Sequence, residues 1–252
     1  MMWQDLTGII PDLHWGLVLV YLRVQACILA LPGLGERVIP VRVRAAVGLS
    51  ITPLLAGLVP MVAPPQGILP MIGQGLAEIA IGAATGGLLR LLAMAIDVAT
   101  SAIAATASLS QIVGGQNEAA PHPIGNLIHL GGIAVLMALG LPVMLVELMA
   151  DSFVLWPAGS WPEAAAFLPA AVQILSHSFV LAMLLAAPFT LGGFVFQALS
   201  GVINRVMPAL PVTFIGSPLA ILMALVALAI LAPMLVGLWA DAVLDFTLPR
   251  TG

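Results

Sequence analysis

Apolar residues form long blocks along this chain, and polar residues are confined to the short breaks between them. Hydropathy gives six apolar segments, at 15–34, 45–63, 68–113, 124–150, 168–200 and 212–240. The segments do not alternate apolar with polar residues, as the strands of a membrane β-barrel would. Because a helix needs about 20 apolar residues to cross a bilayer, the pattern predicts an all-α protein with six membrane spans.

The breaks between the segments carry residues that end helices. Residues 59–67 read VPMVAPPQG, a turn marked by prolines, and residues 114–123 read GGQNEAAPHP, a polar loop. Residues 156–163 carry Trp156 and Trp161, and tryptophan favours the membrane interface. We therefore expect short connections and one integral membrane domain over residues 1–252.

One segment, 68–113, is too long for a single span. As one helix it would extend about 65 Å, roughly twice the hydrocarbon thickness, so it must bend, double back or leave the bilayer. Arg90 and Asp97 lie in it about two turns apart and on nearly one face, with Glu78 further round. A charge at membrane depth costs about 2.5 to 3.5 kcal/mol, so these three side chains should face protein or water.

The composition supports a membrane protein and excludes other classes. Hydrophobic residues make up 62% of the 252 and charged residues 7%, with a mean hydropathy of +1.17. The net charge of -4 is scattered, and no basic patch is interleaved with aromatic residues, so a nucleic-acid partner is not expected. Cys27 is the single cysteine, which excludes an internal disulfide and a cysteine metal cluster.

The basic residues suggest an orientation. The stretch GERVIPVRVR, residues 35–44, holds three of the seven arginines of a chain without lysine. Arginines beside a span stay cytoplasmic, and a six-span count puts Arg205 on that side and Arg250 on the other. No basic residue precedes Arg23 and no small-residue cleavage site follows the first apolar segment, so we expect a retained anchor.

Motifs for catalysis are missing from the sequence. It has no H-E-x-x-H, no G-x-x-x-x-G-K and no G-x-S-x-G, so neither an enzyme nor a cofactor is expected. His122 and His129 are seven residues apart, and a loop and helix-start pair is a commoner explanation for them than a metal site.

Small residues and prolines leave two alternatives open. Gly82 and Gly86 have the G-x-x-x-G spacing of ordinary helix packing, although broken helices with buried charges also suit a transporter. The stretch SLSQIVGGQNEAAPHP, residues 108–123, is either a plain connector or a pliable gate of a pore.

Three sequence blocks together resemble the FliR family of flagellar export-gate proteins, called SctT in virulence injectisomes. The first block is LPGLGERVIPVRVR, the second EIAIGAATGGLLR, and the third NRVMPALPVTFIGSPL. Their order and spacing agree with the family over nearly the whole chain. The matching positions are Pro32, Gly35, Glu36, Arg37, Pro40, Arg42, Val43 and Arg44, then Glu78, Ile81, Gly82 and Gly86, then Asn204, Arg205, Pro208, Leu210, Ile215, Gly216, Pro218 and Leu219.

The resemblance implies a function. A family member is a multi-pass inner-membrane protein of kinked helical hairpins, packed in a hetero-oligomeric assembly at the flagellar basal body. It is a non-enzymatic subunit that forms part of a pore for unfolded proteins and uses no cofactor. Its expected partners are FliP-like and FliQ-like subunits, FlhB-like and FlhA-like export proteins, and membrane lipid.

The resemblance also implies roles for particular residues. The central loop of the family contributes to a plug that closes the pore, although this chain reads SLSQIVGGQNE where the family has a Gly-Leu-x-Phe and Asp-Pro pattern. Thr213 and Ser217 also stand where the family often has aromatic residues. The expected plug residues are Gln111, Gly114, Gly115, Gln116 and Asn117. The expected assembly or buried-charge residues are Glu36, Arg37, Arg42, Glu78, Arg90, Asp97, Asn204 and Arg205.

The rival hypothesis is a carrier for an ion or small molecule. It would bind its solute at intramembrane charges, for which the chain offers Arg23, Glu78, Arg90 and Asp97. A carrier would transport its solute alone, whereas an export-gate subunit would need its partners even to remain stable. The choice between a flagellar and an injectisome system stays open.

Overall fold

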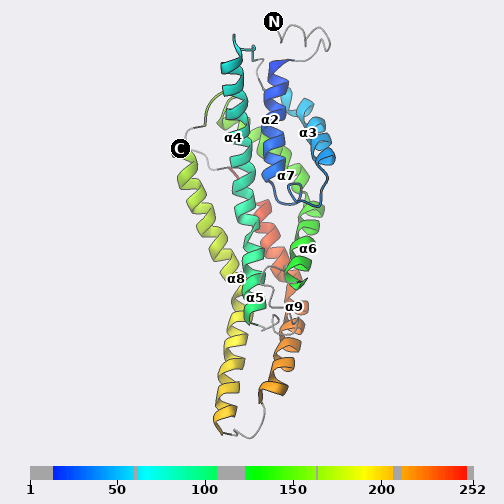
Figure 1. The fold of residues 1–252 in the computed structure, drawn as a ribbon, viewed down its shortest axis with the longest axis vertical. Coiled ribbons are helices and arrows are strands. Elements are labelled where there is room, and N and C mark those ends of the chain that lie inside the picture. Colours follow the sequence, from blue (N-terminus) through cyan, green and yellow to red (C-terminus); the bar gives the residue numbers. More distant parts are fainter. Residues whose placement is uncertain (1–13, 60–61, 107–122, 163, 207–211, 249–252) are drawn as a thin grey trace. The chain divides into compact units, whose positions relative to one another are not determined.

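The computed structural model is built of α-helices, which confirms the predicted fold class. It describes residues 14–59, 62–106, 123–162, 164–206 and 212–248. The described helices are α2 (Trp15–Ala30), α3 (Val41–Ala56), α4 (Ile68–Ala93), α5 (Ala95–Thr106), α6 (Pro123–Leu139), α7 (Leu141–Leu155), α8 (Ala164–Val206) and α9 (Val212–Leu244) (Figure 1).

Contacts divide the chain into two compact units. Unit 1 takes Met1–Leu91, Met137–Ile174 and Leu244–Gly252, and unit 2 takes Leu92–Leu136 and Leu175–Val243. Each unit is therefore assembled from stretches far apart in the sequence. That the whole chain acts as one integral membrane domain stays a prediction.

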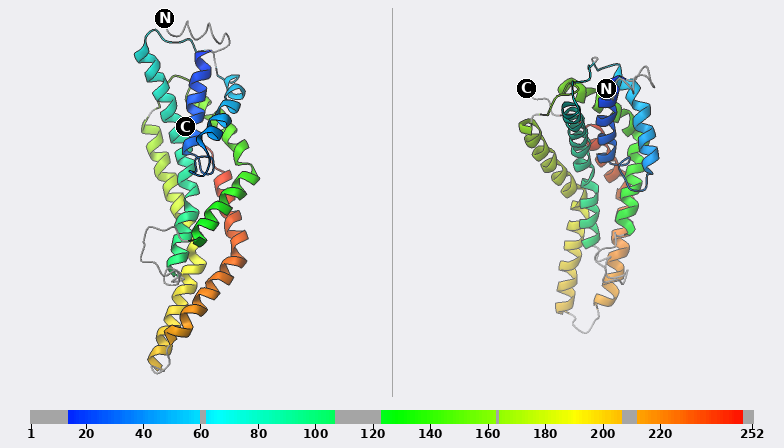
Figure 2. Two further views of the ribbon diagram at one scale, coloured as in Figure 1. Left: turned by 45° about the vertical axis from the view of Figure 1, so that its right-hand side comes forward. Right: turned by 45° about the horizontal axis from the view of Figure 1, so that its top comes forward.

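In unit 1, α2 and α3 form an antiparallel pair (Figure 2). Helix α2 ends at Ala30 because Pro32 follows it and Gly33 takes a φ of +82°, a left-handed conformation that favours glycine. Helix α3 then starts directly after Pro40, whose fixed φ suits the entry to a helix. The core is apolar, and its fully buried side chains include Leu19, Ile28, Leu55 and Ile81.

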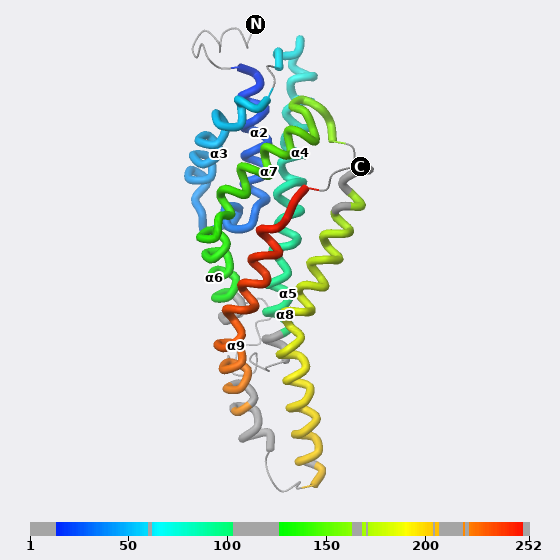
Figure 3. The backbone as a smooth tube through the Cα atoms, turned by 180° about the vertical axis from the view of Figure 1, so that it is seen from behind, coloured from blue at the N-terminus to red at the C-terminus, as the bar shows by residue number. Residues whose placement is uncertain are grey.

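In unit 2, α8 and α9 run antiparallel on either side of residues 207–211 (Figure 3). The buried Trp239 of α9 donates a hydrogen bond from Nε1 to the carbonyl oxygen of Ala93 at 3.0 Å. Gly132 of α6 lies against the same ring, where an added Cβ would come within 2.9 Å of it. Trp239 therefore joins three segments of this unit.

The number of candidate spans differs from the expected six. Within the described residues, three helical stretches are long and apolar enough to cross a membrane: Ile68–Ala102, Ala171–Ile203 and Leu222–Leu244. A fourth is possible if the bent pair of α6 and α7 counts as one span. Segments 15–34 and 45–63 give only the 16-residue helices α2 and α3, which are shorter than the about 20 residues needed to cross a bilayer. Pro32 follows the end of α2, whereas α3 contains Pro53 and ends at Gly57. The described residues therefore give three or four candidate spans, fewer than the six expected from hydropathy.

Two breaks shape the longer apolar segments. In the described part of the 68–113 segment, one residue, Met94, separates α4 from α5, and Ile68–Ala102 still forms one long apolar stretch. That the whole segment bends or leaves the bilayer stays a prediction. Helices α6 and α7 are bent by 69° at Gly140, whose φ is +115°. Such a backbone conformation is open mainly to glycine, so Gly140 sets the bend.

Candidate functional site

A buried ion pair joins α2 to α4 in unit 1. Arg23 Nε donates a hydrogen bond to Glu78 Oε2 at 2.6 Å, and neither side chain is exposed. Arg23 lies midway along α2 and Glu78 midway along α4, and both helices are otherwise apolar there. The pair cancels two charges inside the helical core.

The Arg23 guanidinium also binds α7. Its Nη1 donates to the carbonyl oxygen of Ser152 at 2.9 Å and to Ser152 Oγ at 3.3 Å. The ring of Phe153 lies 3.9 Å from the guanidinium carbon, a cation–π contact. Among the described residues no acceptor reaches Nη2. Arg23 is thus held on three sides by two helices.

The second oxygen of Glu78 holds the turn that follows α7. Glu78 Oε1 accepts a hydrogen bond from the backbone N–H of Gly159 at 2.6 Å, and Gly159 takes a φ of +82°. One turn earlier on α4, Gln74 Oε1 accepts a hydrogen bond from Trp15 Nε1 at 2.7 Å. The polar cluster therefore joins α2, α4, α7 and the 156–160 turn.

Two glycines bring α2 and α4 close enough for this pair. A Cβ at Gly82 would clash with the carbonyl oxygen of Arg23, and one at Gly86 would lie 2.6 Å from the carbonyl oxygen of Cys27. The G-x-x-x-G spacing thus marks a backbone-to-backbone contact, as in packed membrane helices. Helix packing, the ordinary explanation, is the one that the structure supports.

Buried ion pairs do little for net stability, yet breaking one is costly. Desolvation offsets most of the Coulomb attraction, but a lone charge left in the core destabilises by about 3 to 5 kcal/mol. Here each charged group also has further hydrogen bonds, which satisfy most of its capacity. The cluster is built to fix one arrangement of helices, and its charges are closed to solvent.

A second polar link lies in the arginine-rich loop after α2. The carboxylate of Glu36 accepts a hydrogen bond from Arg90 at 3.3 Å, and its backbone carbonyl oxygen accepts one from Arg44. Arg90 is 40% exposed and Glu36 22% exposed, so this pair is accessible to solvent. Glu36 ties the loop to α4 and to the start of α3.

A third pair lies in unit 2 and was missed by the sequence analysis. His129 Nδ1 of α6 lies 2.7 Å from Asp97 Oδ1 of α5, with both side chains partly exposed. His129 had been considered only with His122, which lies outside the described residues. The described residues contain no group of three or more potential metal ligands.

The predicted site residues thus fall into separate places. Glu78 pairs with Arg23, which only the carrier hypothesis had named, and Glu36, Arg90 and Asp97 have the partners given above. Arg37, Arg42 and Arg205 are exposed, and Asn204 lies in α8 with its side chain outside the description. The plug candidates Gln111, Gly114, Gly115, Gln116 and Asn117 lie outside the described residues.

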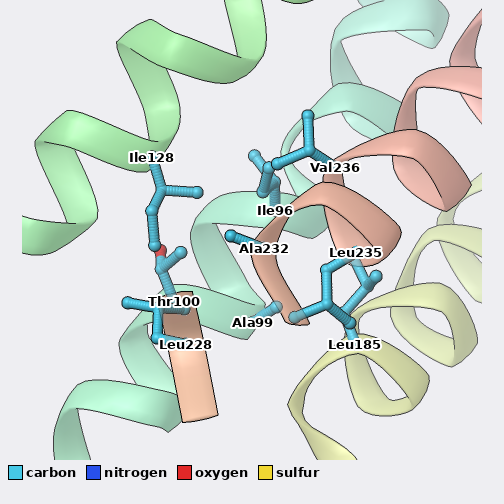
Figure 4. Close-up of a pocket in the computed structure, with 9 residues that line it drawn as sticks. All are labelled: Ile96, Ala99, Thr100, Ile128, Leu185, Leu228, Ala232, Leu235 and Val236. Carbon is cyan, nitrogen blue, oxygen red and sulfur yellow. The ribbon is translucent and has the colours of Figure 1, made fainter. Parts of the chain in front are cut away.

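Unit 2 contains a small apolar pocket. Side chains of α5, α6, α8 and α9 line it, among them Ile96, Ile128 and Leu185, with Thr100 as its polar member (Figure 4). Its volume of about 30 Å³ is enough for about one water molecule. It has no charged lining residue and no room for an organic solute.

Comparisons with known proteins agree with the resemblance found in the sequence. The family model described as bacterial export proteins, family 1, matches residues 15–246. The flagellar biosynthetic protein FliR of Caulobacter vibrioides is 30% identical over 233 residues, which is 88% of this chain and 90% of that protein. The FliR of Pectobacterium carotovorum subsp. carotovorum is 24% identical over 236 residues, 92% of this chain and 88% of that one. This all-helical chain belongs to the FliR family of bacterial export proteins.

Proposed function

We propose that the chain is a structural and gating subunit of a type III protein export gate in the bacterial inner membrane. In this role it forms part of the wall of the pore that passes unfolded flagellar or effector proteins. Its partners would be FliP-like and FliQ-like subunits, with FlhB-like and FlhA-like export proteins beside them. Family membership and the apolar surface of the isolated chain support the proposal.

The observation that carries the proposal is the length of the apolar surface along α8. Exposed apolar side chains run from Leu175 to Val206, with Phe194 72% exposed between them. At 1.5 Å per residue this stretch is about 47 Å long, whereas the hydrocarbon layer is about 30 Å thick. Lipid can cover only part of it, and apolar patches of this size mark protein interfaces. Neighbouring subunits would cover the rest.

The carrier hypothesis has less support. Of the four charged residues that it needs, Arg23 and Glu78 are fully buried and bonded to each other. The pocket of Figure 4 is apolar and too small for an organic solute. A closed, internally bonded pair suits a scaffold better than a site that must bind and release its cargo.

Co-expression tests the proposal. The chain is produced alone and together with the FliP-like and FliQ-like proteins of the same genome, then purified through a tag on the chain. We expect the chain to aggregate when it is produced alone. On co-expression we expect one monodisperse particle that contains all three proteins and is visible by electron microscopy. A stable monomer in mild detergent that leaves both partners behind would overturn the proposal.

A further inference from the structure

Helix α7 has one buried side and one side that no described residue covers. Its buried residues are Leu141, Met144, Leu145, Leu148, Met149, Ser152 and Phe153. The opposite side carries Val143, Glu147, Asp151 and Val154, all of them exposed. Because steps of three or four residues return to the same side of a helix, these four side chains form one stripe. We call this stripe the acidic face of α7.

The two carboxylates of the acidic face have no counterion in the described part of the chain. The ion pairs found there join Arg23 to Glu78, Arg90 to Glu36 and His129 to Asp97. Glu147 and Asp151 lie about 6 Å apart along the helix axis, and like charges at this spacing weaken a helix. The fold of the chain alone therefore gains nothing from either carboxylate.

The acidic face lies level with the middle of α2 and not with one of its ends. Asp151 directly precedes Ser152, whose carbonyl oxygen binds the guanidinium of Arg23 midway along α2. Helix α3 contacts α7, and the exposed side chains of α3 include Leu49 and Leu54. The two carboxylates therefore interrupt a largely apolar surface, with an exposed valine on either side of them along α7.

Neither water nor lipid suits a surface of this kind. Water leaves the apolar side chains unfavourably exposed, and acyl chains leave the two carboxylates without solvation or a counterion. A protein surface satisfies both requirements if it presents apolar side chains to the valines and basic groups to the carboxylates. Charges that are buried at an interface are tolerated where each one meets an opposite charge.

We propose that the acidic face of α7 docks a basic helix of a neighbouring subunit. This helix carries two lysine or arginine residues one turn apart, a spacing that matches Glu147 and Asp151. Apolar residues before and after the basic pair cover Val143 and Val154. The inference rests on the proposed function, because it needs a neighbouring subunit, and it adds the chemistry by which that subunit is recognised.

Capture of partners by charge variants of the full chain tests this inference. The tagged chain is co-expressed with the FliP-like and FliQ-like proteins, and the amount of each partner that it retains is measured. We expect Glu147→Gln/Asp151→Asn to lower the retained amount of one partner roughly ten-fold or more, because the basic groups of that partner lose their counterions. Glu147→Lys/Asp151→Lys should abolish its capture.

A charge exchange identifies the docking helix and excludes misfolding as the cause of a loss. Pairs of basic residues three or four positions apart in the apolar helices of the partners are replaced by glutamate, one pair at a time. We expect one of these changes to restore capture by the Glu147→Lys/Asp151→Lys variant. A loss of capture that none of the exchanges restores would overturn the inference.

A second pair of carboxylates provides a matched control. Asp241 of α9 and Asp245 just after it are also exposed and four residues apart, so Asp241→Lys/Asp245→Lys makes the same change of charge elsewhere. This control should retain both partners. Equal losses in the two lysine variants, or full capture by the Glu147→Gln/Asp151→Asn variant, would overturn the inference alone. A wild-type chain that captures neither partner would overturn the proposed function and this inference with it.

Discussion

Arg23 and Glu78 each depend on the other, because both are buried and each supplies the opposite charge. Arg23→Met alone or Glu78→Met alone should destabilise the protein by about 3 to 5 kcal/mol, because each change leaves one buried charge without its partner. The unfolding temperature and the yield should fall accordingly. The double variant Arg23→Met/Glu78→Met should be less damaging than either single change. Thermal unfolding of the purified partner complex measures this, and a double variant as unstable as the sum of the singles would contradict it.

Gly82 has no room for a side chain. Gly82→Ala should separate α2 from α4 and lower the unfolding temperature, because the new methyl group meets the carbonyl oxygen of Arg23. Gly87→Ala is the matched control on the same helix, since nothing lies within 4 Å of its added Cβ. There, alanine should stabilise by about 0.5 to 1 kcal/mol through helix propensity. Equal effects of the two changes would refute the close contact.

The sequence analysis named Arg23 and Glu78 as candidate charged residues, but it did not predict that they pair with each other. The apolar surroundings of Glu78 indicated that it would not face lipid, and the structure shows it buried against protein. Its partner lies 55 residues earlier, and the Ser152 carbonyl oxygen lies 129 residues after Arg23. Such distant pairings depend on how the helices pack, and one sequence contains no signal for them. The same holds for Asp97 and His129.

At the scale of helices, Glu36 and Arg90 connect a loop to α4. We predict that Arg90→Ala weakens co-purification with the partner subunits and abolishes export, because the arginine-rich loop loses its link to that helix. Arg90→Lys should retain part of both activities, since it keeps the charge without the planar fork. Pull-down and a secretion assay measure the effect. Normal export by the Arg90→Ala variant would contradict this prediction.

Asp97 and His129 connect α5 to α6, the helices on either side of residues 107–122. Asp97→Ala should likewise weaken assembly and abolish export, because the 2.7 Å contact between the two helices is lost. His129→Ala should have the same effect if the pair acts as a unit, which pull-down of both variants would show. Normal co-purification and secretion with Asp97→Ala would count against this role.

The family resemblance gives one prediction for the loop between α5 and α6. Replacing Gly114 and Gly115 by valine should stiffen the chain there and change the ion leak and secretion of the assembled gate. Conductance of membranes that carry the complex, together with secretion, is the measurement. If this variant had the ion leak and the secretion of the wild type, the loop would not take part in gating.

The hydropathy pattern predicted helices better than it predicted spans. Six apolar segments all contain helices, yet α2 and α3 have only 16 residues each. Pro32 and the left-handed Gly33 follow the end of α2, and α3 ends at Gly57. Hydropathy measures how apolar a segment is, whereas the length of a helix depends on these few breaking residues. Both short helices also pack on each other, which a window average cannot register.

For the whole molecule, the proposed function and the carrier hypothesis differ in what one chain can do. Vesicles reconstituted with the chain alone should show no solute uptake and no ion leak above empty vesicles, because its charged core is closed. Co-reconstitution with the partner subunits should restore a regulated leak. Saturable uptake of a solute by the lone chain, lost in Glu78→Gln, would establish the carrier instead.

The three-sided hold on Arg23 has a consequence for biosynthesis. Its first partner, Glu78, leaves the ribosome long before Ser152 and Gly159 do. A nascent chain in which α2 and α4 have both emerged therefore already contains the two opposite charges of the core, and the hydrogen bonds of Ser152 and Gly159 are added only later in synthesis.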